Sequence, residues 1–211
     1  MNTLNDARVS AVIERLHAAA ANDGDRWSRR RAAQKAGELP QDDGLVRMGE
    51  FYLAVSPEEG RLLYLLARSR RARTLVEFGA SFGVSTLYLA AAARDLDARL
   101  LTTEVHPDKC RALRANLAEA GLDDGVEVLE GDALQTLAAI DGPIDLLLLD
   151  GWKSLYRPLF EMLRPRLSDG ALVVADNVDH EAAADYVRCI GEDPAFLTHT
   201  LGDAAISCHV G

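Results

Sequence analysis

Two acidic motifs in the second half of the chain have the residue types needed to hold a divalent cation. Asp150 ends the apolar run 146–149, and Asp176 and Asn177 follow the apolar run 173–175. Because both runs read as neighbouring parallel strands, their carboxyl ends should bring these side chains together. Carboxylate and amide oxygens suit Mg²⁺, which keeps its other positions for water and substrate. The alternative is that Asp176-Asn177 forms only a turn.

A glycine-rich turn earlier in the chain predicts a ligand-binding site. Glu77 lies at the end of the apolar run Thr74–Phe78, and Gly79 and Gly83 follow before a helical stretch begins at Ser85. Glycines let the backbone approach a ligand closely, and the strand end and helix start both favour ligand binding. The spacing matches neither a dinucleotide-binding GxGxxG nor a phosphate-binding P-loop. An acidic residue before the turn suits a cationic, phosphate-free ligand, although an ordinary glycine turn is the alternative.

Acidic residues also end the next two expected strands. Glu104 ends one of them, where a carboxylate can accept both hydroxyls of a ribose. Asp132 follows the next strand and could hold an adenine amino group, while the backbone N–H of Ala133 meets a ring nitrogen. Each residue alone could be a helix cap or turn former. Acidic residues at three successive strand ends, Glu77, Glu104 and Asp132, together with the glycine turn, favour a site for S-adenosylmethionine (SAM).

The order of elements predicts the sheet that would position these residues. Strands and helices alternate from Thr74 onward, which implies a mostly parallel sheet with helices on both faces. Gly202-Asp203 is a hairpin signal that adds an antiparallel strand at the end. We therefore predict an α/β fold with a doubly wound, seven-stranded, mostly parallel sheet and extra N-terminal helices. The expected strands are 74–78, 98–104, 126–131, 144–150, 171–175, 196–201 and 204–209, and the helices between them are 85–93, 107–120, 133–137, 155–167 and 181–190.

The residues before the first strand read mainly as helices. We expect helices over 1–21, 25–36 and 56–69, the last begun by a capping box of Ser56 and Glu59 with Pro57 at its first position. A loop at 37–44 and an apolar segment at 45–55 that could cover a pocket separate the second helix from the third. We predict a single domain over 1–211, with a helical lid or dimer segment over 1–45 and a SAM-binding core over 46–211.

The composition limits partners and compartment. The net charge of −10 over 211 residues argues against a nucleic-acid partner. The basic cluster Arg26–Arg31 could contact RNA or another acidic partner, although a solvated helix face is the simpler interpretation. Three cysteines are too few for a disulfide framework, and neither a secretion signal nor a membrane span is present, so we expect a cytoplasmic protein without membrane contact.

Three motifs together resemble the metal-dependent small-molecule O-methyltransferases of the catechol O-methyltransferase-like family, in particular its compact bacterial members. They are Glu-x-Gly-x-x-x-Gly-x-Ser at Glu77–Ser85, Asp-x-Trp-Lys at Asp150–Lys153 and Ala-Asp-Asn at Ala175–Asn177. The resemblance extends from about Met48 to the C-terminus. It implies a Rossmann-like class I methyltransferase fold, SAM and Mg²⁺ or another divalent cation as cofactors, a small hydroxylated acceptor and a homodimer. A methyltransferase acting on RNA or protein and a non-catalytic SAM-binding protein are the alternatives.

The resemblance implies a role for each matched residue. Asp150, Asp176 and Asn177 would ligate the metal. Lys153 would be the general base and would have to be neutral to take the proton of a hydroxyl acidified by the cation. The residues expected to contact SAM are Val55, Glu77, Gly79, Ala80, Ser85, Glu104, Val105, Asp132, Ala133, Asp150 and Trp152.

One stretch departs from the family pattern. Catechol enzymes of the family carry a carboxylate just before the last hairpin, where it orients the second phenolic hydroxyl. Here Phe196–Thr200 contains no acid, and Asp203 in the turn is the nearest one. This departure disfavours a simple catechol as the acceptor and leaves a vicinal diol or another metal-chelating phenol open.

Overall fold

The computed structural model describes residues 2–39, 44 and 48–211. Residues 40–43 of the expected loop and residues 45–47 of the expected apolar segment lie outside the described residues. Within the described part, no helix is both long enough and apolar enough to cross a membrane.

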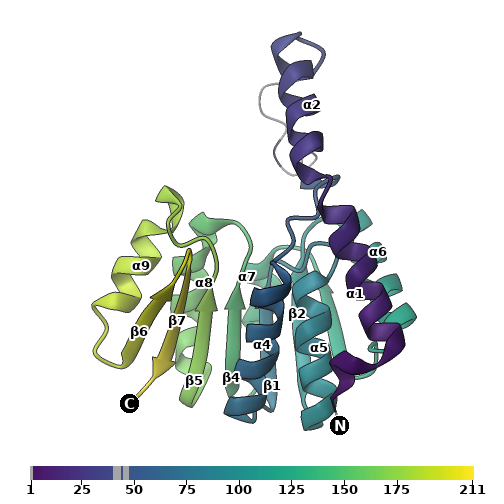
Figure 1. The fold of residues 1–211 in the computed structure, drawn as a ribbon. Coiled ribbons are helices and arrows are strands. Elements are labelled where there is room, and N and C mark those ends of the chain that lie inside the picture. Colours follow the sequence, from purple (N-terminus) through teal and green to yellow (C-terminus); the bar gives the residue numbers. More distant parts are fainter. Residues whose placement is uncertain (1, 40–43, 45–47) are drawn as a thin grey trace.

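A seven-stranded sheet runs through the described residues in the order β3-β2-β1-β4-β5-β7-β6 (Figure 1). Strands β1 to β5 pair in parallel, and β7 is antiparallel to both β5 and β6. The predicted mixed sheet with a C-terminal hairpin is therefore confirmed. The strands are β1 Thr74–Phe78, β2 Arg99–Glu104, β3 Val126–Glu130, β4 Ile144–Leu149, β5 Leu167–Ala175, β6 Phe196–Leu201 and β7 Ala204–His209.

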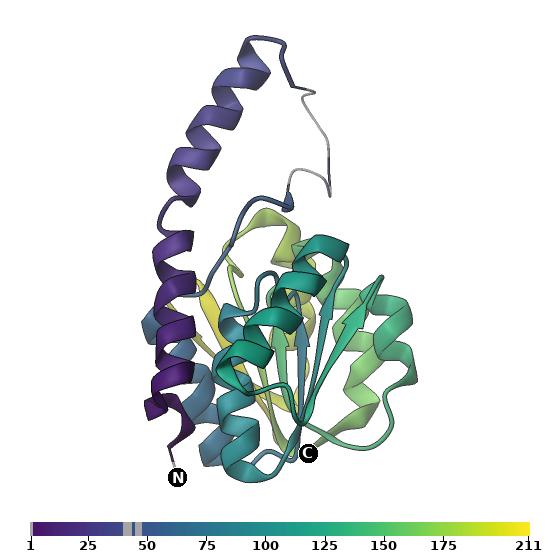
Figure 2. The same cartoon turned by 90° about the vertical axis from the view of Figure 1, so that its right-hand side faces the viewer.

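Helices cover both faces of this sheet and divide its core into two parts. One apolar cluster joins the sheet to α1, α4, α5 and α6, and the other joins it to the segment around α7 and to α8 and α9 (Figure 2). This arrangement is the doubly wound packing that alternating strands and helices predict. The helices are α1 Ala7–Ala20, α2 Asp23–Lys35, α4 Pro57–Arg70, α5 Val84–Leu96, α6 Pro107–Ala120, α7 Ala133–Thr136, α8 Tyr156–Leu163 and α9 Ala184–Gly191.

Helix α4 begins as its sequence predicts. The Ser56 hydroxyl accepts a hydrogen bond from the backbone N–H of Glu59, and the Glu59 carboxylate accepts one from the backbone N–H of Ser56. This reciprocal capping box satisfies two backbone donors that the first turn of a helix leaves without partners. It also fixes the carboxylate of Glu59 at the sheet edge where α4 starts.

The predicted boundary between α8 and β5 was wrong. The helix ends at Leu163 and a 3-10 turn spans Arg164–Arg166, so the helix does not reach Leu167. Pro165 lacks the N–H that a continuing α-helix would use. The strand then begins at Leu167, which pairs with Ile144, and its register shifts before the regular pairing starts. The polar segment that follows Leu167 reads as a loop but extends the strand.

Helix α2 extends beyond the body of the molecule, past the edge of the sheet where the parallel strands end (Figures 1 and 2). Two of its arginines form ion pairs, Arg26 with Asp23 at 2.6 Å and Arg30 with Glu50 at 3.1 Å. These contacts engage part of the basic cluster Arg26–Arg31 within the chain itself, which favours a structural use of those two arginines.

Candidate active site

The candidate site lies where the strand order reverses, between β1 and β4. Open α/β sheets bind ligands at the carboxyl ends of the strands beside such a reversal. The register pairs Phe78 with Leu149 and Leu149 with Ala175, so the residues that follow these three strands lie side by side. The backbone N–H of Asp150 bonds Phe78 O at 2.9 Å, and that of Asp176 bonds Leu149 O at 3.0 Å.

Gly79 makes this close approach possible. Its φ of +99° lies in a region that other residues rarely adopt. A Cβ atom at this position would lie 2.5 Å from the backbone oxygen of Asp150 and 2.7 Å from Cα of Gly151. Only glycine therefore lets the turn after β1 pack against the chain leaving β4.

Asp150 and Asp176 place two carboxyl groups close enough for one to act on the charge of the other. Burial raises the pKa of Asp150 well above its usual range, Lys153 lowers it, and the charge and hydrogen-bonding contact of Asp176 raise it. Burial likewise raises the pKa of Asp176, with Lys153 opposing the shift. Two neighbouring carboxylates that are partly withdrawn from water repel each other unless a proton or a cation offsets their charge. With the amide of the adjacent Asn177, they are the oxygen-bearing residue types that suit Mg²⁺, and their role as ligands stays a prediction.

Lys153 lies beside this pair. Its Nζ atom is 3.6 Å from Oδ1 of Asp150, and the two side chains are only 14% and 10% exposed. The ammonium donates a 2.8 Å hydrogen bond to the hydroxyl of Tyr156, which donates to the backbone oxygen of Asp176 at 3.0 Å. The lysine side chain is thus largely withdrawn from solvent and held beside Asp150.

Two further carboxylates reach the same place from other elements. Oxygen atoms of Glu59, Asp176 and Asp203 lie within 4.8 Å of one another. Asp203 comes from the β6–β7 turn, where it accepts hydrogen bonds from the Asn177 side chain at 3.4 Å and, through its backbone oxygen, from Val178 N at 2.7 Å. Phe196–Thr200 contains no acid, but the β6–β7 turn places the carboxylate of Asp203 beside that of Asp176. No motif pointed to Glu59 at this site, because its role in the capping box already explained that residue.

Hydroxyl groups surround the carboxylate of Glu77. It is fully buried and accepts hydrogen bonds from Ser85 Oγ and Thr86 Oγ1, both at 2.6 Å, and from Thr102 Oγ1. Burial raises the pKa of Glu77, and the three hydroxyl donors lower it. Two of the residues predicted to contact SAM, Glu77 and Ser85, therefore bond to each other beneath the glycine turn.

The remaining predicted SAM contacts lie along the same sheet edge. The carboxylate of Glu104 accepts hydrogen bonds from the backbone N–H groups of Ser81 at 2.8 Å and Val105 at 2.9 Å. Asp132 caps α7 by accepting a 2.9 Å bond from Leu134 N. Of the others, Val55, Ala80 and Ala133 are buried, whereas Val105 and Trp152 are exposed.

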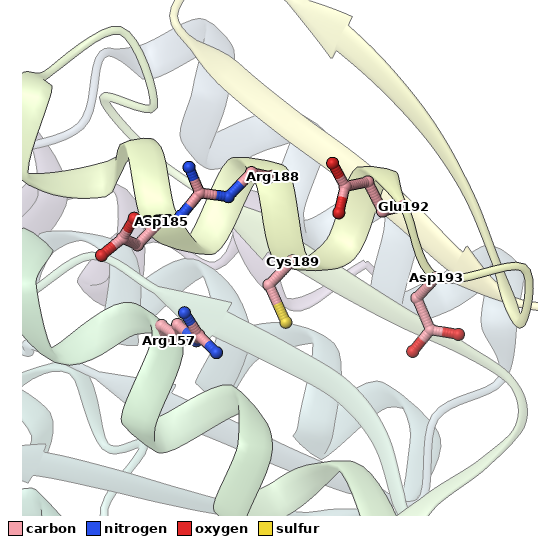
Figure 3. A pocket seen from close by; sticks show the side chains of 6 residues that line it. All are labelled: Arg157, Asp185, Arg188, Cys189, Glu192 and Asp193. Carbon is pink, nitrogen blue, oxygen red and sulfur yellow. Dashed lines mark hydrogen bonds and ion pairs between the residues drawn. The ribbon is translucent and has the colours of Figure 1, made fainter.

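A hollow elsewhere on the surface contains none of the predicted site residues. It has a volume of about 260 Å³ and lies between α8 and α9 (Figure 3). Its two arginines are paired within the chain, Arg157 with Glu161 at 2.9 Å and Arg188 with Asp185 at 2.7 Å. This hollow therefore adds nothing to the candidate site.

Comparison with known proteins gives consistent matches. A model described as "Methyltransferase domain" matches residues 76–178. The chain is 34% identical over 177 residues to a catechol O-methyltransferase from Mycobacterium tuberculosis, covering 77% of this chain and 75% of that protein. It is 32% identical over 144 residues to a catechol O-methyltransferase from Niastella koreensis, covering 66% and 65%.

Solved structures share the fold over most of the chain. The crystal structure of cofactor-bound Rv0187 from MTB has a TM-score of 0.69 at 30% identity and covers 87% of this chain and 88% of that one. The O-methyltransferase TomG from Streptomyces achromogenes, crystallised in complex with SAM, has a TM-score of 0.71 at 27% identity and covers 98% and 91%.

Proposed function

The chain belongs to the class I SAM-dependent O-methyltransferases of the catechol O-methyltransferase family. From this premise we propose that it methylates a hydroxyl of a small aromatic or diol-bearing acceptor, and that the reaction uses Mg²⁺ or another divalent cation. The observation that carries the proposal is that Lys153 Nζ lies 3.6 Å from Oδ1 of Asp150, at the strand end that Asp176 adjoins. The relatives' names, which describe catechol O-methyltransferases, support the choice of acceptor class.

Asp150, Asp176 and Asn177 would hold the cation. Their donor set fits, because two carboxylates and an amide offer oxygen ligands, and a cation would add positive charge beside the single charge of Lys153. When bound, the cation supplies positive charge that stabilises the oxyanion of the acceptor.

Lys153 would act as the general base of the transfer. Its Nζ atom would take the acceptor's hydroxyl proton while the acceptor oxygen takes the methyl group of SAM. Tyr156 limits the motion of the lysine through its 2.8 Å hydrogen bond, and Asp150 lies 3.6 Å from the same Nζ atom. Holding both reactants in this geometry contributes to the rate by avoiding the entropy cost of a bimolecular encounter.

Asp203 and Glu59 would face the acceptor beyond Asp176. Because their carboxylates lie within 4.8 Å of that of Asp176, a second hydroxyl of a diol has an acceptor for its hydrogen bond. This placement extends the proposal to catechols, which the sequence alone disfavoured. The SAM contacts proposed are those of the glycine turn, Glu104, Asp132 and the exposed Trp152.

The test compares Lys153→Met with Lys35→Met, which makes the same change on an exposed residue of α2. Methyl transfer from SAM to a panel of catechols, diols and monophenols should fall by about 10²–10⁴-fold in Lys153→Met. Binding of S-adenosylhomocysteine (SAH), measured by calorimetry, should stay unchanged in both variants. EDTA should abolish transfer by the parent, and Mg²⁺ should restore it. Undiminished transfer by Lys153→Met, or by the parent in EDTA, would refute the mechanism.

A further inference from the structure

Lys109 is a buried cation that the proposed chemistry does not use. It lies in the first turn of α6 and is only 3% exposed. Burial disfavours an ammonium group, and the positive end of the helix dipole disfavours it further. The described residues offer its Nζ atom one hydrogen-bond acceptor, the hydroxyl of Ser81 at 3.0 Å, and the ring of Phe82 at 5.4 Å. A costly group in this position calls for a compensating role.

The contact with Lys109 fixes the direction of the Ser81 hydroxyl. An ammonium group can only donate hydrogen bonds, so the oxygen of Ser81 must accept. The Ser81 hydroxyl hydrogen is then left for its other partner, the backbone oxygen of Tyr52 at 2.7 Å. Lys109, Ser81 and Tyr52 therefore form a chain of hydrogen bonds with a single direction.

The backbone of Ser81 connects this chain to Glu104. Ser81 has a φ of +49°, in the left-handed region that residues other than glycine seldom adopt. In this conformation its N–H donates a 2.8 Å hydrogen bond to Oε2 of Glu104. The hydroxyl bonds of Ser81 thus help to hold a backbone geometry that orients the carboxylate proposed to bind the ribose.

Tyr52 connects the chain to the segment that leads to Val55. Its ring stacks on Phe82 with centroids 4.3 Å apart, and its N–H donates to Asp23 Oδ2 at 2.9 Å. The bond from Ser81 to Tyr52 O holds this segment against the glycine turn. One buried cation is therefore linked to the glycine turn, to Glu104 and to the approach to Val55.

We propose that Lys109 is a positioning residue for SAM: through Ser81 it holds the glycine turn, Glu104 and the Tyr52–Val55 segment in the arrangement that binds the cofactor. The proposal rests on the SAM site of the proposed function. Lys109 acts through Ser81 and requires no contact of its own with the cofactor.

The test measures SAH binding by calorimetry, which needs neither acceptor nor metal. Lys109→Met should raise the dissociation constant for SAH about tenfold or more, whereas the exposed Lys35→Met should leave it unchanged. The melting temperature of Lys109→Met should stay close to that of the parent, because the relief of the ammonium's desolvation cost is opposed by the loss of its attraction to Glu104 and Asp23. A merely structural lysine would instead lose stability and affinity together.

Ser81→Ala supplies an independent variant in case Lys109→Met does not fold. It removes the same chain of hydrogen bonds while leaving Lys109 in place, so SAH affinity should again fall. The double variant should bind SAH no more weakly than the weaker single variant, because both changes break one chain. With a methyl acceptor, the KM for SAM should rise in each variant while kcat and the acceptor's KM change little.

Three outcomes would overturn parts of the proposal separately. If the parent binds SAH and both single variants bind it within twofold of the parent, the positioning role of Lys109 is wrong and the SAM site stands. Fully additive losses in the double variant would also contradict a shared chain. If the parent itself does not bind SAH, the SAM site fails, and the proposed function fails with it.

Discussion

The ammonium of Lys153 and the hydroxyl of Tyr156 lie 2.8 Å apart. Because Tyr156 in turn donates a hydrogen bond to the backbone oxygen of Asp176, this contact connects the proposed base to the backbone at the end of the neighbouring strand. Tyr156 is fully buried, so its hydroxyl has no competing solvent. The base is thus oriented by a group that belongs to the core.

Tyr156→Phe tests this arrangement. Loss of the hydroxyl leaves Asp176 O without this donor and frees Lys153, so we expect a stability loss of about 1–2 kcal/mol. The kcat for methyl transfer should fall about tenfold, with SAH affinity unchanged. Urea unfolding and steady-state kinetics measure these quantities.

Tyr186→Phe is the matched control. Tyr186 is buried and packs edge to face against Tyr156, but its hydroxyl has no hydrogen-bond partner among the described residues. Removing this hydroxyl should leave stability equal or higher and kcat unchanged. Equal effects of the two substitutions on kcat would show that Tyr156 contributes only packing.

Gly79→Ala should damage both the fold and the site. The new methyl group would collide with the backbone of Asp150, and φ would remain at +99°. We expect a stability loss of more than about 1 kcal/mol and loss of SAH binding. Gly37→Ala shares the positive φ, +76°, but has open space around its Cβ position. If Gly79→Ala and Gly37→Ala lose the same stability and both bind SAH, the close packing of the Gly79 turn against the backbone of Asp150 contributes neither to stability nor to cofactor binding.

Glu77 should make stability depend on pH in a definite direction. Burial raises its folded-state pKa above the ordinary 4.5, so the folded protein holds this proton more tightly than the unfolded chain. The stability due to the protonated form is complete below pH 4.5 and is lost as pH rises toward the folded-state pKa. In Glu77→Gln this loss should disappear, so the variant's stability relative to the parent should increase with pH across that window.

Urea unfolding in EDTA at a series of pH values above 4 measures this effect. Glu127→Gln, an exposed residue of β3, serves as the control and should run parallel to the parent. A Glu77→Gln curve that also runs parallel would contradict the role of burial at Glu77.

Asp203→Asn should affect the acceptor and leave the cofactor alone. The Asp203 carboxylate lies next to that of Asp176, where a second hydroxyl of a diol would be bound. We expect the KM of a diol to rise about tenfold, the cost of one hydrogen bond to a charged group, and the KM of a monophenol to change much less. Steady-state kinetics with the diol and the monophenol measure these KM values, and Asp179→Asn at an exposed position is the control. Equal changes of KM for both acceptors in Asp203→Asn would refute the prediction.

The sequence predicted the elements well where local signals agreed with the tertiary structure. The capping box at Ser56 and the hairpin at Gly202-Asp203 both formed at the predicted positions. Each depends on residues within a few positions of one another, so short-range chemistry decides it. The predicted start of β5 was wrong. Leu167 pairs with Ile144, more than twenty residues away, and this pairing overrides the loop-like sequence that follows Leu167.

The candidate site was only partly visible for the same reason. Asp150 and Asp176 stand at strand ends, and parallel pairing brings strand ends together. Glu59 and Lys109 reach their places through helix packing, which leaves no motif in the sequence. Their importance rests on neighbours such as Asp203 and Ser81 that lie far away along the chain.

The antiparallel direction of β7 has a practical consequence for handling the protein. Because β7 runs from the Asp203 turn toward the opposite edge of the sheet, Gly211 emerges on the side away from the reacting groups (Figure 1). An affinity tag or surface attachment joined after Gly211 should therefore leave catalysis and cofactor entry undisturbed, and it would orient immobilised molecules with their open edge toward the solution.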